Sequence, residues 1–247
     1  MSLSLKNVTG GYGHLAVLKD VSFDVNAGEM IGLIGLNGAG KSTTIKEIIG
    51  LLTPQQGSIT INNQSLAMDS EAYRKAIGYI PETPSLYEEL TLREHIEVTA
   101  MAYDIPKEEA FKRAQPLLET FRLDTKLDWF PAHFSKGMKQ KVMVLCAFLV
   151  EPDLYIIDEP FLGLDPLAIH ALLELMAERK KAGAAILMST HILATAERYC
   201  DRFVVLHEGK VRAYGTLVEL QKEFNMPEAS LDDIYLALTT LEGAVQS

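Results

Sequence analysis

Hydrophobic and polar positions follow different patterns in different parts of the chain. From residue 3 to residue 25 they roughly alternate, and residues 58–61 repeat the alternation after a turn at residues 54–57. Alternation is typical of strands with one buried and one exposed face. We therefore predict a layer of half-exposed antiparallel strands in the first quarter of the chain.

Three short stretches are apolar without interruption: Met30–Ile34, residues 154–157 and residues 185–188. Strands of a parallel sheet that is covered on both faces have this composition. A last core strand is expected around residues 204–206. The sequence thus predicts a central parallel sheet, in addition to the antiparallel layer.

The period becomes helical between about residues 82 and 150. Thr91 and Glu94 have the spacing of a capping box, which marks a helix N-terminus. The helical pattern continues through Lys107–Phe121. We predict a helical segment inserted into an α/β core.

The chain has no low-complexity tract or internal repeat that would mark a linker. We therefore expect residues 1–225 to form one domain, with the helical segment inside it. Residues 226–247 are predicted to form an accessory C-terminal segment. In it, Ser230 and Asp233 are suited to cap a short helix that extends to about Thr240.

Composition and charge exclude several classes of function. The 247 residues include 33 acidic and 23 basic side chains, for a net charge of −10. Such a field repels nucleic acid and anionic lipid. The longest apolar run, residues 142–150, is far shorter than the roughly 20 residues that span a bilayer. The N-terminus lacks a basic region followed by an apolar core. We expect a cytoplasmic protein without a membrane span.

The two cysteines, Cys146 and Cys200, lie far apart in the sequence and form no metal-binding pattern. We expect both to be buried, reduced thiols.

Residues 35–42 read Gly-Leu-Asn-Gly-Ala-Gly-Lys-Ser and fit the phosphate-loop pattern GxxxxGK[ST]. They follow the buried strand Met30–Ile34 and open a helical pattern. The glycines let backbone N–H groups turn toward phosphate oxygens, and the helix N-terminus adds positive charge. Lys41 would neutralise the β- and γ-phosphates, and Ser42 would ligate Mg²⁺. The predicted nucleotide-binding residues in this segment are Gly35, Asn37, Gly38, Ala39, Gly40, Lys41, Ser42 and Thr43.

A phosphate loop is shared by kinases, GTPases, helicases and ATPases, so a second site must decide the chemistry. Asp158 and Glu159 stand at the end of the apolar run 154–157. We expect this strand to lie beside the phosphate-loop strand, with Asp158 holding Mg²⁺ through water. Glu159 would polarise the water that attacks the γ-phosphate, and general-base help of this kind is worth about 10²- to 10⁴-fold in rate.

These features together resemble the ABC ATPases. That family shares the phosphate loop, the Asp-Glu-Pro strand end, an LSGGQ-like signature before that strand and a later switch histidine. Residues 134–138, Phe-Ser-Lys-Gly-Met, resemble the signature, with Ser135 and Gly137 at the positions whose donors meet the γ-phosphate in the family. Lys136 and Met138 differ from the consensus glycine and glutamine. Ser135 also suits the N-cap of a helix over residues 138–149, and both roles can coexist.

Four further positions resemble motifs of the family. Asp165 belongs to a Gly-Leu-Asp segment that resembles the D-loop. His191 resembles the switch histidine that contacts the γ-phosphate, although a lone histidine is more often structural. Tyr12 stands where the family places an adenine-stacking aromatic, but a turn tyrosine without a ligand is equally common. Glu82 replaces the Q-loop glutamine and keeps an oxygen ligand for Mg²⁺.

A closer resemblance is to the ATP-binding subunits of bacterial Ecs-type transporters, within the ABC-2 exporter-like group. It is carried by residues 80–90, 132–140, 159–166 and 189–200. The resemblance implies a P-loop NTPase (RecA-like) α/β fold, with a parallel sheet core, an antiparallel β subdomain and an inserted helical signature subdomain.

The resemblance also implies a function. The chain would bind and hydrolyse ATP with Mg²⁺ as a subunit of an ABC exporter, with Lys41, Glu159 and His191 as catalytic residues. In the family, the signature of one subunit completes the ATP site of the other, so a head-to-tail homodimer is expected. An integral membrane subunit would hold this dimer peripherally on the inner face of the cell membrane.

Two other functions are weighed against this one. A soluble ABC ATPase that acts on nucleic acid or ribosomes usually carries two cassettes per chain or long coiled-coil insertions, and neither is present. Three lysines at positions 136, 139 and 141 are more typical of a solvated helix face than of a nucleic-acid patch. A non-hydrolysing nucleotide sensor would have lost Lys41, Glu159 or His191, and all three are present.

Overall fold

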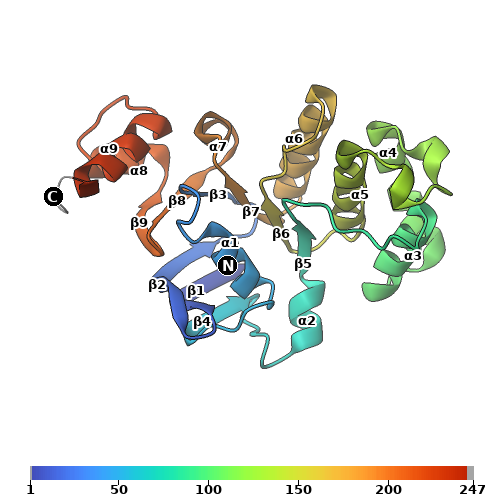
Figure 1. Cartoon of the computed structure of the whole chain (residues 1–247), viewed down its shortest axis with the longest axis horizontal. Coiled ribbons are helices and arrows are strands. Elements are labelled where there is room, and N and C mark those ends of the chain that lie inside the picture. Colours follow the sequence, from blue (N-terminus) through green and yellow to red (C-terminus); the bar gives the residue numbers. More distant parts are fainter. Residues whose placement is uncertain (1, 244–247) are drawn as a thin grey trace.

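A largely parallel sheet forms the centre of the molecule (Figure 1). The structure is a computed structural model that describes residues 2–243. Across this part of the chain the six strands run in the order β5-β6-β7-β3-β8-β9. Neighbouring strands from β5 to β8 are parallel, and β9 is antiparallel to β8. The strands are β3 (Met30–Ile34), β5 (Ile77–Ile80), β6 (Leu154–Asp158), β7 (Ala185–Thr190), β8 (Arg202–His207) and β9 (Lys210–Gly215).

The uninterrupted apolar runs form the strands predicted from them. Every residue of β3, β6 and β7 is buried, because helices or the second β layer cover both faces of this sheet (Figure 1). Two strands were not predicted. β5 has only four residues, and β9 follows β8 through a turn at Glu208 and Gly209, so β8 is not the last strand of the core.

The strand order also corrects an expectation about the site. β6, which ends at Asp158, does not lie beside the phosphate-loop strand β3, because β7 lies between them and is hydrogen-bonded to both. Neighbouring strands are about 4.8 Å apart, so the ends of β3 and β6 are separated by about two such spacings. The end of β7 therefore lies between the phosphate-loop strand and Asp158.

The alternating segments form an antiparallel sheet of order β2-β1-β4, as predicted. Its strands are β1 (Leu3–Tyr12), β2 (Leu15–Val25) and β4 (Gln56–Ile61). Its apolar side chains share one buried cluster with residues of β3 and of helix α1 (Lys41–Ile48). The short helix α2 (Ser70–Lys75) follows this sheet. The antiparallel layer therefore covers the helix that begins at the phosphate loop.

The predicted helical segment contains α3 (Leu92–Ala102), α4 (Lys107–Phe121) and α5 (Lys136–Leu149), with two short 3₁₀ turns between α4 and α5. These helices lie at one end of the molecule (Figure 1). The capping box forms at the start of α3, where Thr91 and Glu94 each accept a hydrogen bond from the other's backbone N–H. The Oγ of Ser135 caps α5 by accepting from the N–H of Met138 at 3.2 Å.

The remaining helices are α6 (Pro166–Lys181), α7 (Leu193–Tyr199), α8 (Leu217–Glu223) and α9 (Leu231–Gly243). α9 is the predicted C-terminal helix, with Ser230 and Asp233 hydrogen-bonded at its start. Residues 244–247 of the predicted accessory segment lie outside the described residues, and the domain boundaries stay a prediction. No helix in residues 2–243 is long and apolar enough to cross a membrane. Cys146 and Cys200 are free cysteines. Each residue as a whole is half-buried, and burial raises the pKa of both thiols.

Candidate nucleotide-binding site

The phosphate loop joins β3 to α1 and has the backbone shape that its glycines allow. Gly38 and Gly40 have φ angles of 84° and 114°, in the left-handed region that favours glycine. A Cβ on Gly35 would lie 2.5 Å from the carbonyl oxygen of Leu206 on β8, so the loop passes tightly over the sheet. The Nζ of Lys41 donates to the Gly35 carbonyl at 2.7 Å. The loop therefore presents backbone N–H groups and a lysine at the start of a helix.

A cleft of about 630 Å³ extends from this loop across the ends of β6 and β7. It brings together predicted residues that are far apart in the sequence. Its lining residues are Leu36, Asn37, Lys41, Ser42, Glu82, Asp158, Glu159 and His191. An adjoining groove on the other side of the loop is lined by Tyr12, Val17, Gly38, Gly40 and Thr43, among others. The parallel strand ends are the place where ligands bind in open α/β sheets.

Ser189 links the two adjacent carboxylate residues and was not predicted. It is fully buried near the end of β7, and its Oγ donates to Asp158 Oδ1 at 2.5 Å. The same Oγ accepts from the backbone N–H of Glu159 at 3.2 Å. The register pairs Asp158 with Ser189 across β6 and β7. Only its position beside His191 in the Ser-Thr-His segment could have indicated it from sequence.

Glu159 and His191 form a pair at the edge of the cleft. His191 Nδ1 lies 2.8 Å from Glu159 Oε2. The Glu159 side chain is mostly enclosed, with 11% of its surface exposed, whereas 55% of the His191 side chain is exposed. Glu159 has a φ of 46°, unusual for a residue with a side chain, and such strain is concentrated at functional sites. The pair thus presents an enclosed base and an accessible imidazole to the same space.

Burial raises the pKa of Asp158, and the hydrogen bond from Ser189 lowers it by a smaller effect. The nearby Glu82 and Glu159 carboxylates also raise this pKa, while the Lys41 ammonium lowers it. Negative charge is therefore crowded in the cleft, and a cation among these oxygens would relieve it. No group of three or more His, Cys, Asp or Glu side chains in residues 2–243 is arranged to hold a metal by itself. This donor set fits Mg²⁺, which usually binds one or two carboxylates together with substrate phosphates.

Tyr12 lies at the end of β1 and borders the groove beside the phosphate loop. Its hydroxyl accepts a hydrogen bond from Lys46 Nζ at 3.0 Å, and this bond lowers the pKa of Tyr12. The residue is 46% exposed, and the Lys46 Nζ lies over its ring, 5.3 Å from the ring centroid. Stacking on adenine stays a prediction.

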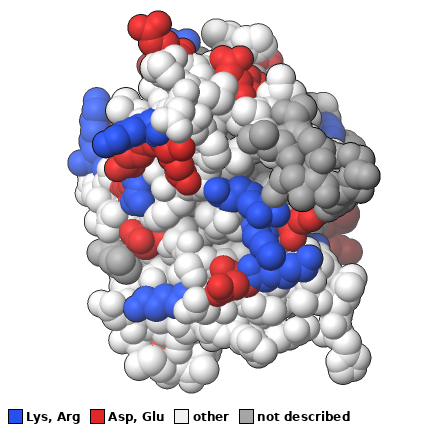
Figure 2. All heavy atoms as spheres, turned by 90° about the vertical axis from the view of Figure 1, so that its left-hand side faces the viewer, with Lys and Arg blue, Asp and Glu red and all other residues white. Residues whose placement is uncertain are grey.

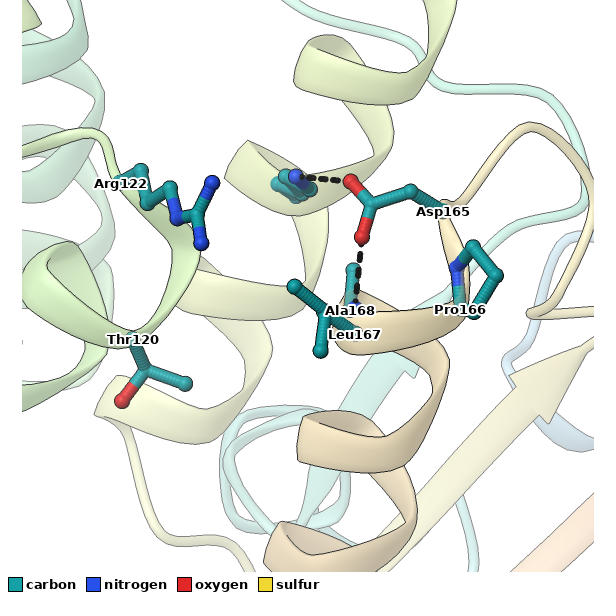
Figure 3. Close-up of a pocket in the computed structure, with 7 residues that line it drawn as sticks. Thr120, Arg122, Asp165, Pro166, Leu167 and Ala168 are labelled. Carbon is teal, nitrogen blue, oxygen red and sulfur yellow. Dashed lines mark hydrogen bonds and ion pairs between the residues drawn. The ribbon is translucent and has the colours of Figure 1, made fainter.

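The signature and D-loop residues lie outside this cleft. Gly137 is so close to the D-loop that a Cβ would lie 2.3 Å from the Gly163 carbonyl oxygen. Asp165 caps α6 through the N–H of Ala168 at 2.9 Å, and its other oxygen pairs with Lys141 Nζ at 2.7 Å (Figure 3). Asp165 and Lys141 line a separate pocket near the end of α4. Within one chain, Ser135, Gly137 and Asp165 therefore do not join the phosphate-loop cleft.

Comparison with known proteins places the chain among nucleotide-binding subunits. The family model described as "ABC transporter" matches residues 18–162. The chain is 66% identical over 237 residues to the ABC-type transporter ATP-binding protein EcsA of Bacillus subtilis (strain 168), covering 96% of both chains. It is 36% identical to the Nod factor export ATP-binding protein I of Sinorhizobium fredii, covering 85% of this chain and 61% of the relative.

Solved structures agree with these relatives. The structure of an ATP-binding subunit of an ABC transporter superposes with a TM-score of 0.94 at 62% identity, over 97% of this chain and all of the other. A dimeric ATP-binding cassette in a post-hydrolysis state, bound to ADP and phosphate, has a TM-score of 0.77 at 27% identity, over 87% of this chain and 98% of the other. The P-loop NTPase-type α/β fold predicted from the sequence is confirmed.

Proposed function

Because this chain belongs to the ABC transporter family and is the ATP-binding subunit of such a transporter, we propose that it hydrolyses ATP in a head-to-tail homodimer and thereby powers export. One observation carries the hydrolytic part. Lys41, Asp158 and the Glu159–His191 pair line one cleft. They supply the charge compensation, the metal ligand and the base that phosphoryl transfer to water needs.

Each residue has a distinct task in this mechanism. The phosphate-loop N–H groups and Lys41 hold the β- and γ-phosphates in line with the attacking water. Glu159 accepts the proton of that water, because its carboxylate is enclosed and contacts His191, while its backbone N–H donates to Ser189 Oγ. His191 contacts the γ-phosphate and orients Glu159 through the 2.8 Å contact. Ser42, Asp158 and Glu82 would hold Mg²⁺, which neutralises charge that develops on the phosphate oxygens.

The dimer is proposed from the residues that the cleft lacks. Ser135, Gly137 and Asp165 lie elsewhere in the same chain, as they must if they complete the site of a second copy. A two-fold arrangement then makes two equal composite sites, with Lys41 of each copy facing Ser135 of the other. The dimeric cassette among the similar structures supports this arrangement. Loss of the γ-phosphate would remove a bridge between the subunits and reopen the dimer.

Export and location rest on the relatives. One relative is named for Nod factor export, and the transporter family implies a membrane subunit that converts closure into transport. We propose that the dimer binds this subunit at the inner face of the cell membrane. A role on nucleic acid is less well supported, because the net charge is −10. On the face shown in Figure 2, basic and acidic side chains are also interspersed rather than gathered into a basic surface.

Mixed dimers test the composite site. Lys41→Ala removes the phosphate charge compensation, and Ser135→Asp places a carboxylate against a γ-phosphate bound to the other subunit. Aspartate is as good an N-cap as serine, so α5 should keep its start, and Ser135→Asn is the neutral control. Each variant alone should be inactive as a homodimer. A mixture should recover hydrolysis, because one of the two sites keeps both wild-type residues.

The matched control mixes Lys41→Ala with Glu159→Ala. Both of these residues belong to the same half-site, so neither composite site is intact and no recovery is expected. Differently tagged chains verify that heterodimers form. Verified heterodimers of the first pair that remain inactive, or recovery in the control pair, would contradict the proposed arrangement.

A further inference from the structure

Strand β5, which leads to Glu82, lies at the end of the strand order and packs against the helical segment (Figure 1). Helix α5 lies so close to β5 that a Cβ on Gly78 would be 3.1 Å from the Ala147 carbonyl oxygen. At the start of β5, the hydroxyl of Tyr103, directly after α3, donates to the Ile77 carbonyl at 2.6 Å. The helical segment therefore helps to set the path of the chain into the cleft.

Gln140 of α5 makes a contact one residue before Glu82. The side chain of Gln140 is fully buried, and its Nε2 donates to the carbonyl oxygen of Pro81 at 3.3 Å. Pro81 directly precedes Glu82, which lines the cleft. The proline ring fixes φ of residue 81, and the bond to its carbonyl oxygen restrains ψ, because ψ sets the direction of that carbonyl. Both soft backbone angles before Glu82 are thus restrained.

The amide of Gln140 is costly to bury. In the described part of the chain its Oε1 has no hydrogen-bond partner, and a buried acceptor without a partner opposes folding. An apolar side chain of the same length would avoid that cost, so stability alone does not account for glutamine at this position. What the amide supplies is the bond from Nε2 to the segment that carries Glu82.

A second contact from α5 reaches the same segment farther along the chain. Residues 83–90 form no helix or strand, and among them Glu88 pairs with Lys139 Nζ at 3.1 Å. The Glu88 side chain is 58% exposed, and exposed ion pairs contribute little. This pair also lies several residues past Glu82, so it restrains the backbone there less directly than the bond to Pro81 does.

We propose that Gln140 is a positioning residue for Glu82: by holding the Pro81 carbonyl, it fixes where the Glu82 carboxylate enters the cleft and so strengthens the Mg²⁺ site. The physical reason is preorganisation. A carboxylate on a segment without regular structure must be ordered when the metal binds, and an anchor one residue away reduces this entropic cost in advance. The proposal rests on the proposed function, in which Glu82 is a ligand of Mg²⁺.

Gln140→Met tests the amide, because methionine keeps an unbranched side chain of similar length and has no N–H. Binding of a fluorescent ATP analogue is measured with Mg²⁺ and with EDTA, and the ratio of the two affinities is the Mg²⁺ effect. We expect this effect to fall about three- to tenfold, the range of one neutral hydrogen bond. The affinity in EDTA should stay at the wild-type value. The unfolding midpoint should also be unchanged, because removal of the unpaired Oε1 offsets the lost bond.

Lys139→Met is the matched control, since it is the same substitution at the neighbouring position of α5 and removes the exposed pair with Glu88. It should leave the Mg²⁺ effect unchanged, and a loss as large as that of Gln140→Met would overturn the assignment to Gln140. A double variant shows whether Gln140 acts through Glu82. In a Glu82→Ala background, Gln140→Met should cause no further loss of the Mg²⁺ effect, and a further loss of the same size would overturn the proposal.

Pro81→Ala tests the same restraint from the other side, because it keeps the carbonyl but frees φ. We expect the Mg²⁺ effect to fall about two- to fivefold, the change that the restraint of a proline ring is worth. A wild-type Mg²⁺ effect in a folded Gln140→Met overturns the positioning role; should that variant not fold, a wild-type effect in Pro81→Ala does so. Equal affinities of the wild type in Mg²⁺ and EDTA would instead contradict the metal site of the proposed function, so the two failures are distinguishable.

Discussion

Replacing Glu159 by glutamine should stop hydrolysis while leaving ATP bound. Glutamine has nearly the same shape as glutamate, and the Glu159 backbone N–H keeps its contact with Ser189 Oγ. The amide can still contact His191 at the position of Oε2, which lies 2.8 Å from the imidazole in the wild type. Its oxygen, however, is far too weak a base to take a proton from water. The substitution therefore removes one chemical task and little of the geometry.

The size of the effect follows from the role assigned to this carboxylate. General-base help contributes about 10²- to 10⁴-fold in rate, which is about 3–5 kcal/mol of transition-state stabilisation. We expect kcat to fall by this factor and the affinity for ATP to stay within about threefold of the wild type, because Glu159 is not a phosphate-binding group in this mechanism. Slow hydrolysis should also make the ATP-bound dimer persist.

Three measurements decide the prediction: single-turnover hydrolysis, ATP affinity, and dimer formation by light scattering with ATP and Mg²⁺. Glu228→Gln is the matched control. Glu228 has a positive φ of 64°, as Glu159 has one of 46°, but it is exposed and far along the chain from the cleft residues. The control should behave like the wild type. Wild-type hydrolysis by Glu159→Gln would refute the assignment of the base.

Two further predictions concern buried groups. Glu47 of α1 is 3% exposed, neither of its carboxylate oxygens has a hydrogen-bond partner, and burial raises its pKa from 4.5 to about 7. Its contribution to stability is therefore present below pH 4.5 and lost as the pH rises through 7, so Glu47→Gln should unfold like the wild type near pH 4.5. Above pH 8 the variant should be more stable than the wild type by up to about 3 kcal/mol in denaturant titrations. If the variant and the wild type are equally stable at both pH values, Glu47 does not ionise at a cost in the folded protein. Ser189→Ala removes the hydroxyl that hydrogen-bonds to both Asp158 and Glu159. It should lower kcat about tenfold, which corresponds to about 1.4 kcal/mol. A folded variant with the kcat of the wild type would contradict this prediction.

Local chemistry made several parts of this protein predictable. The three short apolar runs have the composition of strands buried on both faces, whereas the longer apolar run at residues 142–150 lies in the helical segment and belongs to α5 up to Leu149. The phosphate loop is recognisable because its glycines and lysine act within eight consecutive residues, and the caps at Thr91 and Ser135 act over three. The departures in the Q-loop and signature were visible as well, but their consequences depend on contacts that no local pattern contains.

Strand order and long-range contacts were beyond the reach of sequence patterns. The sequences of β6 and β7 do not indicate which of the two strands lies next to β3, because parallel strands of similar composition can exchange places without changing their burial pattern. Because β7 lies next to β6, Ser189 hydrogen-bonds to both Asp158 and Glu159 and becomes part of the site, although it belongs to no motif of its own. β5 and β9 were missed since four apolar residues, or a mixed strand at a sheet edge, give too weak a periodic signal.

By itself, the sequence determined most of the helices and strands, the phosphate loop and the family, because these depend on side-chain chemistry within short windows. Only the tertiary structure decided that Glu159 and His191 meet at 2.8 Å, that Ser135, Gly137 and Asp165 stay outside the cleft of their own chain, and that α9 packs against α7 in an apolar cluster that also contains Ile34. Each of these relations joins residues about 30 to 200 positions apart. The packing of whole elements sets such distances, because the hydrophobic effect rewards the total area buried and is non-directional.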